Sequence, residues 1–470
     1  MKTSIVILVL LSATLVVAQT GPDTSWTRTY GGTAYDEAYA MEITSDGYYL
    51  FAGYGSDQSG FGPDFYLVKT DTNGDTLWTR WYGGSSTEVA YDVIECSDGS
   101  YAMAGYTWSY GPGLDNCYVV NVEAGGDTNW TSVFGNPNSI YDHAHAIDQT
   151  TNGDYIVAGK TLSDGYYDFY LVRLDDYGDT LWSQHYGGSA DDEAYDALQT
   201  NDGGFIMAGY SWSFGYSADF YVVKTDSVGD TLWTRTFDSW MDDYARSILA
   251  TTDGGYVIAG YAGYSGTMNS SYIVKIDSIG DVLWTRTIYG LSYNEAYSIH
   301  PTIDGGFIVA GKSEPYMETH SYLVKLDSLG NTQWTQSYFD YSSVHNAAFD
   351  VRQVVDGGFV LAGWKYNNAM YDYDLFIIKT EPDPILLTPN PPVVTISIEG
   401  NHARLTWDPV TESVYGFPIS IYMHNIYNST SPGGPFNYLD FVGGNDTTYV
   451  HYNVLPTNPT MYYQVTADPY

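Results

Sequence analysis

The fold is decided by a stretch that this chain repeats, and its clearest copies read Asp226-Ser-Val-Gly-Asp-Thr-Leu-Trp233-Thr-Arg, Asp253-Gly-Gly-Tyr-Val-Ile-Ala-Gly260 and Ser271-Tyr-Ile-Val-Lys-Ile-Asp277. Its most regular mark is a tryptophan that returns at intervals of 52, 52, 52, 51, 51 and 50 residues. The tryptophans are Trp26, Trp78, Trp130, Trp182, Trp233, Trp284 and Trp334. A repeat of about fifty residues made of short apolar runs and Gly/Asp turns is typical of a propeller or a solenoid.

Each copy reads as four strands. In one copy the first strand is Glu193-Ala-Tyr-Asp-Ala-Leu-Gln and, after the tight turn at Asp202-Gly-Gly, the second is Phe205-Ile-Met-Ala-Gly-Tyr210. A loop of about ten residues leads to Asp219-Phe-Tyr-Val-Val-Lys-Thr, and a second tight turn leads to the strand with the tryptophan. Glycine supplies the positive φ that such hairpin turns need. Four strands per repeat predict a propeller blade.

The two ends of the repeat region indicate how the ring closes. The chain begins with a lone fourth strand at Ser25-Trp-Thr-Arg28, and the repeats stop after a third strand at Leu375-Phe-Ile-Ile-Lys-Thr380. Pairing these two strands completes the last blade and leaves no open edge. The second strands carry glycines at positions 53, 105, 159, 209, 260, 311 and 363. We therefore expect an all-β protein with a seven-bladed β-propeller over residues 19–383, closed by an N-terminal strand.

Other segments flank the propeller. Residues 1–18 combine Lys2, an apolar run from Ile5 to Val17 and a small-residue exit, which predicts a secretory signal peptide. No later stretch is apolar for long enough to predict a transmembrane segment. Residues 384–392 read as a proline-rich linker, and 393–470 as short alternating strands of a small β-sandwich. We expect a secreted or cell-surface protein.

Composition limits the partners. The chain has 17 basic and 56 acidic residues and a net charge of −39, which repels phosphate backbones and excludes nucleic acid as a partner. An acidic surface favours solubility, and it also leaves calcium open as a bound cation. Only two cysteines occur, Cys96 and Cys117. Their places in the repeat put them too far apart for a disulfide, so we expect two free, buried thiols.

Two resemblances add to this picture. Trp407-Asp-Pro, Ile426-Tyr-Asn-Ser-Thr and Tyr462-Tyr-Gln-Val-Thr-Ala467 resemble a fibronectin type III module. That family implies one further strand after Tyr470, so either the sequence is truncated or the Tyr462–Ala467 edge recruits a second copy and the protein self-associates. The propeller repeats resemble those of bacterial secreted proteins, including proteins with type IX sorting tails, and distantly quinoprotein repeats. Quinoprotein dehydrogenases usually have eight blades and an adjacent cysteine pair, so no quinone chemistry is expected.

One column of the loop before each first strand is acidic or amide in every copy. Its members are Asp36, Glu88, Asp142, Asp192, Asp243, Asn294 and Asn346. These oxygens could form a metal site around a central channel, with Asp36, Asp142, Asp192 and Asp243 as candidate calcium ligands. Alternatively, each side chain caps backbone N–H groups between blades. Recurrence in all seven copies favours capping.

A few residues break the symmetry of the repeat. His143 and His145 flank Ala144 where other copies have Glu and Tyr, and Arg246 stands near Asp242 and Asp243. Imidazoles beside carboxylates could perform acid–base catalysis or bind a metal. The simpler interpretation is structural histidines and a surface ion pair for Arg246. The sequence assigns no catalytic residue, because no nucleophile accompanies them in a known pattern.

The loops between second and third strands are rich in aromatic residues. The candidate ligand-binding residues are Tyr106, Trp108, Tyr110, Tyr210, Trp212, Tyr216, Tyr264 and Trp364, together with His143 and His145. Aromatic side chains among Gly, Ser and Asp suit a surface that binds glycans or proteins, although packing between blades is expected to take about half of them. We expect a non-enzymatic binding, adhesion or cell-surface structural protein, without a cofactor other than calcium. The alternative is an extracellular carbohydrate-active enzyme, a glycan hydrolase or lyase.

Overall fold

The computed structural model describes residues 20–32, 35–56, 62–112, 114–136, 139, 141–263, 269–289, 293–314, 318–339, 345–368, 370–390, 392, 394–399, 402–429, 435–452 and 462–469. The predicted signal peptide lies outside these residues. The chain divides into two compact units, Thr20–Glu381 and a second that begins at Pro382. Apart from the short 3-10 helix η2 (Pro384–Leu387), the regular structure of the described residues is all β. No helix in the described ranges has the length and apolar character needed to cross a membrane.

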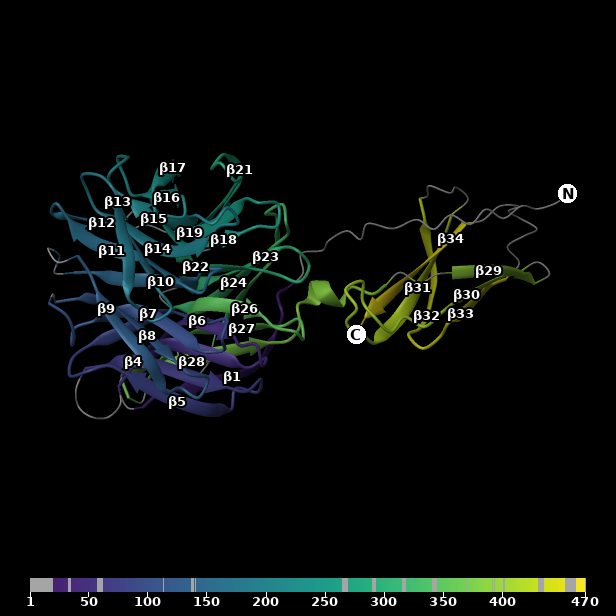
Figure 1. The fold of residues 1–470 in the computed structure, drawn as a ribbon. Coiled ribbons are helices and arrows are strands. Elements are labelled where there is room, and N and C mark those ends of the chain that lie inside the picture. The colour runs from purple at the N-terminus through teal and green to yellow at the C-terminus, as the bar shows by residue number, and fades with distance from the viewer. Residues whose placement is uncertain are drawn as a thin grey trace. The chain divides into compact units, whose positions relative to one another are not determined.

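The first unit consists of four-stranded antiparallel sheets, coloured purple through green in Figure 1. Six of them each consist of four strands that follow one another along the chain. The first three are β2 (Glu37–Ile43), β3 (Tyr49–Gly55), β4 (Asp64–Thr70) and β5 (Thr76–Tyr82); β6 (Glu88–Glu95), β7 (Tyr101–Thr107), β8 (Asn116–Val122) and β9 (Thr128–Phe134); and β10 (His143–Gln149), β11 (Tyr155–Ser163), β12 (Tyr166–Leu174) and β13 (Thr180–Tyr186). The next three are β14 (Asp192–Gln199), β15 (Phe205–Ser211), β16 (Asp219–Thr225) and β17 (Thr231–Phe237); β18 (Asp242–Ala250), β19 (Tyr256–Gly263), β20 (Ser270–Ile276) and β21 (Val282–Ile288); and β22 (Tyr293–Pro301), β23 (Phe307–Glu314), β24 (His320–Leu326) and β25 (Thr332–Tyr338). The seventh contains β26 (Asn346–Gln353), β27 (Phe359–Asn367) and β28 (Asp372–Thr380), joined by β1 (Thr24–Tyr30) from the start of the described chain.

These sheets are the blades of a closed circle. Their first strands contact one another in the order β2, β6, β10, β14, β18, β22 and β26, and β26 contacts β2. In the seventh sheet β1 pairs antiparallel with β28, with Trp26 opposite Lys379 and Tyr30 opposite Leu375. The predicted pairing between the two ends of the repeat region is therefore confirmed. The first unit is a β-propeller.

A β-bulge in every first strand explains the glycine column of the second strands. The bulge follows the recurring alanine in all seven strands. A Cβ on Gly53 would lie 1.8 Å from the carbonyl oxygen of Glu37, and the equivalent distances at the other six glycines are 1.8–2.0 Å. Only glycine permits this approach of two backbones. The bulge leaves one residue of each first strand unpaired and redirects its side chain.

The tryptophan that marks each repeat packs on the following blade. A Cβ on Gly178, in the second tight turn of one blade, would lie 2.6 Å from the ring of Trp130 in the preceding blade. The last tryptophan of the array, Trp334, packs on Gly21 instead, and Tyr338 donates a hydrogen bond of 2.9 Å to the carbonyl oxygen of Pro22. The start of the described chain thus occupies the place that the tight turn of a following blade would take.

The second unit contains two three-stranded sheets. One comprises β29 (Val394–Glu399), β30 (His402–Trp407) and β33 (Thr448–His451), and the other β32 (Asn437–Gly443), β31 (Ile421–Ser429) and β34 (Tyr462–Pro469). One apolar core draws on both sheets through Leu405, Trp407, Ile426 and Val465. Within the described ranges β34 pairs only with β31, so it lies at a sheet edge.

Both cysteines lie in the propeller. Cys96 follows β6 and Cys117 belongs to β8, and both are free and buried. The expectation of two free thiols is confirmed.

Candidate functional site

The propeller has two unlike faces. We call the side that carries the loops before the first strands and the loops between second and third strands the loop face, and the side that carries the two tight turns the turn face. On the loop face the two kinds of loop are joined by backbone hydrogen bonds. Trp108 N donates to Thr87 O at 2.8 Å, and Trp212 N donates to Asp191 O at 3.0 Å. These bonds hold the loops of one blade together as a unit.

Exposed aromatic side chains gather on the loop face, and we call them the aromatic rim. Trp240, 83% exposed, is its most exposed tryptophan in the loops before first strands, and Trp108, 53% exposed, is its most exposed tryptophan in the loops between second and third strands. Among the described loop residues, its members are Tyr35, Trp240, Tyr289 and Phe339 before first strands, and Trp108, Tyr110, Trp212, Phe214, Tyr216 and Tyr371 between second and third strands. Large aromatic side chains that are exposed to solvent on a rigid backbone form a surface suited to binding a ligand.

The predicted ligand-binding residues divide between this rim and the blade packing beneath it. Trp108, Tyr110, Trp212 and Tyr216 are exposed. The others contact neighbouring rings: Tyr106 stacks on His143 with centroids 4.3 Å apart, Tyr210 meets Tyr244 at 4.9 Å, and Trp364 meets Tyr373 at 4.7 Å. Tyr264 lies outside the described residues. Their role in binding a ligand remains a prediction.

The two histidines of β10 have different surroundings. His143 Nε2 lies 2.6 Å from Asp115 Oδ2, below the aromatic rim. His145 Nε2 lies 2.8 Å from Glu193 Oε1 inside the propeller, with Lys160 Nζ 3.2 Å from the same oxygen. Burial lowers the pKa of His145 to about 4, which keeps the imidazole neutral at physiological pH. His145 therefore has a structural environment, whereas His143 reaches the edge of the loop face.

The acidic residues predicted as calcium ligands lie at junctions between blades. Asp36, Asp192 and Asp243 each accept a hydrogen bond from a backbone N–H four residues earlier, at 2.6–2.8 Å. Asp142 is buried at the equivalent position. None of the four is among the residues that line the central cavity, so they do not form an oxygen ring around it, and calcium binding by these residues remains a prediction. The loop turns these side chains toward its own amides, where burial raises the pKa of Asp36 to about 6 and that of Asp243 to about 7.

The bulged side chains of the first strands form a collar that lines a central cavity of about 270 Å³. The collar consists of Tyr39, Tyr91, His145, Tyr195, Arg246, Tyr297 and Phe349. Neighbouring rings touch, for example Tyr39 with Tyr91 at 5.3 Å and with Phe349 at 5.0 Å. The predicted surface ion pair of Arg246 is wrong, because its guanidinium lies 3.8 Å above the ring of Tyr195 and donates to the hydroxyl of Tyr261 at 2.9 Å. The bulge directs this side chain inward, away from Asp242 and Asp243.

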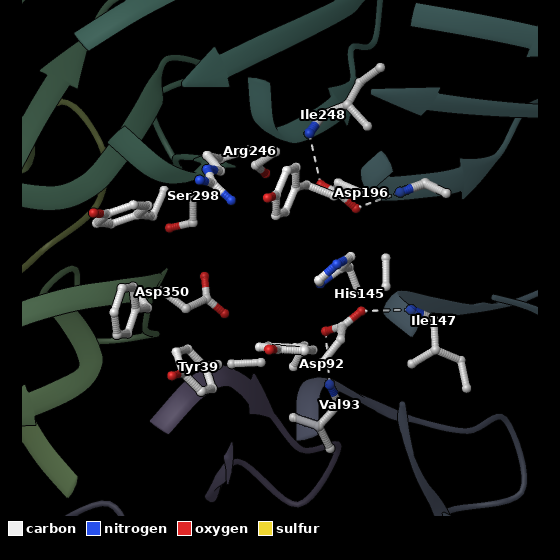
Figure 2. Close-up of a pocket in the computed structure, with 18 of the residues that line it drawn as sticks. Tyr39, Asp92, Val93, His145, Ile147, Asp196, Arg246, Ile248, Ser298 and Asp350 are labelled. Carbon is white, nitrogen blue, oxygen red and sulfur yellow. Dashed lines mark hydrogen bonds between the residues drawn. The ribbon is translucent and has the colours of Figure 1, made fainter. Parts of the chain in front are cut away.

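Below the collar, three aspartates bridge neighbouring blades, and Figure 2 shows the hydrogen bonds of two of them, Asp92 and Asp196. Asp92 accepts one hydrogen bond from Val93 N in its own strand and one from Ile147 N in the next blade, both at 2.8 Å. Asp196 and Asp350 do the same for their own and the following strand, at 2.7–3.0 Å. Each first strand is the inner edge of its sheet, so these N–H groups have no strand partner. The three aspartates therefore supply hydrogen-bond acceptors for backbone N–H groups that the sheets leave unpaired.

The three carboxyl groups differ in charge. Burial raises the pKa of Asp92 to about 8 and that of Asp196 to about 7. Burial acts the same way on Asp350, but Arg352 Nη1 at 2.7 Å and His300 Nε2 at 3.0 Å outweigh it and lower the pKa to about 2. The cavity thus holds one charged network around Asp350 and two carboxyl groups that titrate near neutral pH.

Sequence reasoning missed two groups of residues. It did not identify the aromatic residues of the loops before first strands, such as Trp240. Their place a few residues after the tryptophan strand of each repeat is a signal that could have found them. It also missed acidic residues at the start of third strands, such as Asp168 and Asp219, which face Asp192 and Asp243 across the junctions. No local pattern signals these pairs, because their members are 24 residues apart.

No protein-family model matches the chain, and no curated protein matches it. Among solved structures it is similar to the Pan2 WD40 domain of Neurospora crassa, with 10% identity, a TM-score of 0.45, and coverage of 77% of this chain and 95% of that one. Sqt1 of Chaetomium thermophilum gives 8% identity, a TM-score of 0.47, and coverage of 77% and 98%. PorZ, a bacterial surface component of the type IX secretion system of Porphyromonas gingivalis, gives 10% identity, a TM-score of 0.46, and coverage of 93% of this chain and 60% of that one. Similarity at this level carries no information about ligands or activity, and the propeller assignment rests on the sheets themselves.

Proposed function

We propose that this protein is an extracellular, non-enzymatic binding protein whose loop face recognises a glycan or a protein. The observation that carries the proposal is the aromatic rim, in which ten large aromatic side chains are exposed on one face. Trp and Tyr offer a wide contact area with few rotatable bonds, so little conformational entropy is lost when they bind. The propeller beneath them is a rigid support.

The polar groups around the rim support the same conclusion. Tyr110 donates from its hydroxyl to Gly83 O at 2.8 Å, which fixes the ring across two loops. Ser109 and Ser213 occupy equivalent positions and accept hydrogen bonds from Ser86 N at 2.9 Å and Ala190 N at 3.1 Å. These bonds preorganise the loops. With a net charge of −39, the protein favours neutral or cationic ligands over anionic ones.

The rival enzymatic function would use the pair His143 and Asp115, whose 2.6 Å contact could orient an imidazole for acid–base chemistry. The stacking of His143 on Tyr106, with planes 10° apart, holds that ring within the blade packing. Binding without turnover is therefore the better-supported function.

The finer features of the architecture form part of the proposal. We infer that the seven four-stranded sheets are the complete set of blades and that the second unit is a fibronectin type III-like sandwich. The signal-like residues 1–18 support export and a secreted or cell-surface location. The edge position of β34 supports self-association through the second unit.

A printed array of neutral glycans tests the function, using residues 19–470 expressed as one chain. Binding to a glycan, with no product formed from it on prolonged incubation, is the expected result. Trp212→Ala should abolish the signal, whereas Leu232→Ala, an exposed apolar residue on a fourth strand, should keep it. Product formation that His143→Ala removes would establish the enzyme instead.

A further inference from the structure

The collar around the central cavity contains one arginine. Arg246 takes the place that tyrosine holds in four of the six other blades, and its guanidinium lies 3.8 Å above the ring of Tyr195 and 5.4 Å from that of Tyr261. Arg246 Nη2 donates to the hydroxyl of Tyr261 at 2.9 Å, whereas Nε is buried and has no hydrogen-bond partner among the described residues. The charge of Arg246 also acts on the hydroxyl of Tyr195, where it opposes the rise in pKa that burial causes. Two hydroxyls and two rings thus surround a full positive charge.

No carboxylate in the described ranges forms an ion pair with Arg246. Its charge does act on Glu193: burial raises the pKa of this carboxyl, and His145, Lys160 and Arg246 together outweigh burial and lower it. Glu193 Oε1, however, lies 2.8 Å from His145 Nε2 and 3.2 Å from Lys160 Nζ, and Glu193 Oε2 accepts from the hydroxyl of Tyr210 at 3.0 Å. Both oxygens of Glu193 therefore have other partners.

The carboxyl groups that line the cavity are also engaged elsewhere; they are Glu42, Asp92, Asp148, Asp196 and Asp350. Arg352 forms ion pairs with Asp350 at 2.7 Å and with Glu42 at 3.6 Å. The other three carboxyl groups accept hydrogen bonds from backbone amides at 2.7–3.0 Å. Burial raises the pKa of all three, which favours their neutral forms. The positive charge of Arg246 therefore has no counterion in the cavity.

Ser298 is a second polar group of the cavity whose hydroxyl has no partner. It lies on β22, the first strand after β18 with Arg246, and both residues line the cavity (Figure 2). Ser298 is 6% exposed, and its Oγ has no hydrogen bond with a described residue. Buried hydroxyls nearly always have a partner. The hydroxyl of Ser298 is therefore available to a ligand.

The other blades explain why Ser298 is spare. In each first strand the residue two positions after the recurring alanine has a backbone N–H that needs an acceptor below the collar. Asp92, Asp196, Asp350 and Ser247 already accept from all seven of the N–H groups that follow, which belong to Met41, Val93, Ile147, Ala197, Ile248, Ile299 and Val351. No N–H group of this ring is left for Ser298. Its hydroxyl has no part in joining the blades.

We propose that the central cavity binds a small organic carboxylate, which accepts hydrogen bonds from Arg246 and from the hydroxyl of Ser298. A single positive charge without a counterion suits a single negative charge, and the planar guanidinium matches the geometry of a carboxylate. The rings of Tyr297 and Phe349 offer apolar surface for the carbon atoms of the ligand. A cavity of about 270 Å³ has room for an acid of a few carbons.

The acidic surface of the chain does not conflict with this site. The net charge is −39, but salt screens exposed charges over about 8 Å at physiological ionic strength. Arg246 would act at contact distance inside the cavity, where water screens its charge much less. The site lies within the propeller and uses no residue of the aromatic rim, so this inference is independent of the proposed function.

Isothermal titration calorimetry of the dialysed full chain tests the proposal, with sodium acetate, propionate and butyrate as the probes at constant ionic strength. At about pH 6, Asp92 and Asp196 keep their protons, because burial raises their pKa values to about 8 and about 7. We expect saturable binding of at least one of these acids at one site per chain. Propionamide has the shape of propionate without its charge and should bind at least tenfold more weakly.

Two substitutions remove the proposed donors, and each introduces a residue that other blades carry at the same position. Arg246→Tyr follows the collar of four blades and should weaken binding at least tenfold. Ser298→Ala follows Ala146 and should weaken binding about two- to tenfold. Arg80→Gln removes an exposed arginine of a fourth strand and should leave the affinity unchanged.

Four results would overturn the proposal. The wild type could bind none of the three acids, or it could bind propionamide as tightly as propionate, which would mean that the cavity does not recognise charge. Wild-type affinity in Arg246→Tyr would place the ligand elsewhere. Tighter binding of phosphate or chloride than of any of the acids would contradict an organic carboxylate. If Arg246→Tyr does not fold, Ser298→Ala and the comparison of propionate with propionamide still decide.

Discussion

The two faces of the propeller are built from the same repeat and differ in how far the copies agree. On the turn face five blades place a third-strand lysine against the aspartate of the first tight turn, as in Lys224 with Asp202 at 2.9 Å and Lys325 with Asp304 at 2.8 Å. On the loop face the copies diverge in aromatic residues, histidines and acids. The contacts that recur in most copies stabilise the propeller, and we propose that the residues in which the copies differ recognise a ligand.

The largest effect should come from opening the ring. Deleting residues 19–30 removes β1, which pairs with β28, and the segment on which Trp334 and Tyr338 pack. The lost ladder and core contacts should lower the free energy of unfolding by several kcal/mol and broaden the thermal transition. A deletion variant that melts at the temperature of the parent would show that the ring does not depend on this closure.

A smaller but still large effect should follow from breaking one repeated ion pair. The side chains of Lys325 and Asp304 are 0% and 4% exposed, so Lys325→Met leaves a buried charge without its partner. We expect a loss of about 3–5 kcal/mol in urea unfolding. Arg28→Met removes an exposed pair with Asp75 and is the matched control, with a change of about 0–1 kcal/mol. Equal losses in the two variants would contradict the role assigned to the turn face.

The pH dependence of stability distinguishes Asp92 from Asp350, two of the aspartates below the collar. Burial raises the pKa of Asp92 to about 8, against about 3.9 in an unfolded chain. Between these values the folded state keeps a proton that the unfolded state has released, so this group lowers the free energy of unfolding as pH rises from about 4 to about 8. Asp92→Asn should flatten the slope measured by urea unfolding at about pH 5, 6.5 and 8.

Asp350→Asn is the control for this slope. Its pKa is about 2 in the folded protein, so its stabilising effect is present above about pH 4 and is lost only as pH falls toward 2. The variant should be less stable than the wild type at all three pH values, with a smaller change of slope than Asp92→Asn causes, because burial and not Asp350 is the main cause of the raised pKa of Asp92. If Asp92→Asn keeps the wild-type slope, Asp92 is ionised in the folded protein at neutral pH.

The smallest effect on stability should come from the loop face. Trp240 is 83% exposed, so Trp240→Ala should change the free energy of unfolding by no more than about 0.5 kcal/mol. The measurement is urea unfolding beside the wild type. A loss of 2 kcal/mol or more would mean that the aromatic rim is part of the blade packing.

The sequence predicted the fold well because each structural role recurs at a fixed step. The tryptophan, the turn glycines and the second-strand glycine occupy the same place in every copy, so their contacts follow from one repeat. The site was less predictable. Arg246 was misassigned because only the bulge reveals that its side chain points to the centre. Asp168 and Asp219 were missed because their contacts with Asp192 and Asp243 depend on how two blades pack.

The most direct test of the binding function compares two triple variants on one printed array of neutral glycans. Trp108→Ala/Trp212→Ala/Trp240→Ala changes the aromatic rim, and Leu181→Ser/Leu232→Ser/Leu283→Ser changes equally exposed apolar residues on fourth strands. We expect the rim variant to lose the wild-type signal while the leucine variant, equally folded, retains it. Retention by the rim variant together with loss by the leucine variant would contradict the assignment of binding to the loop face.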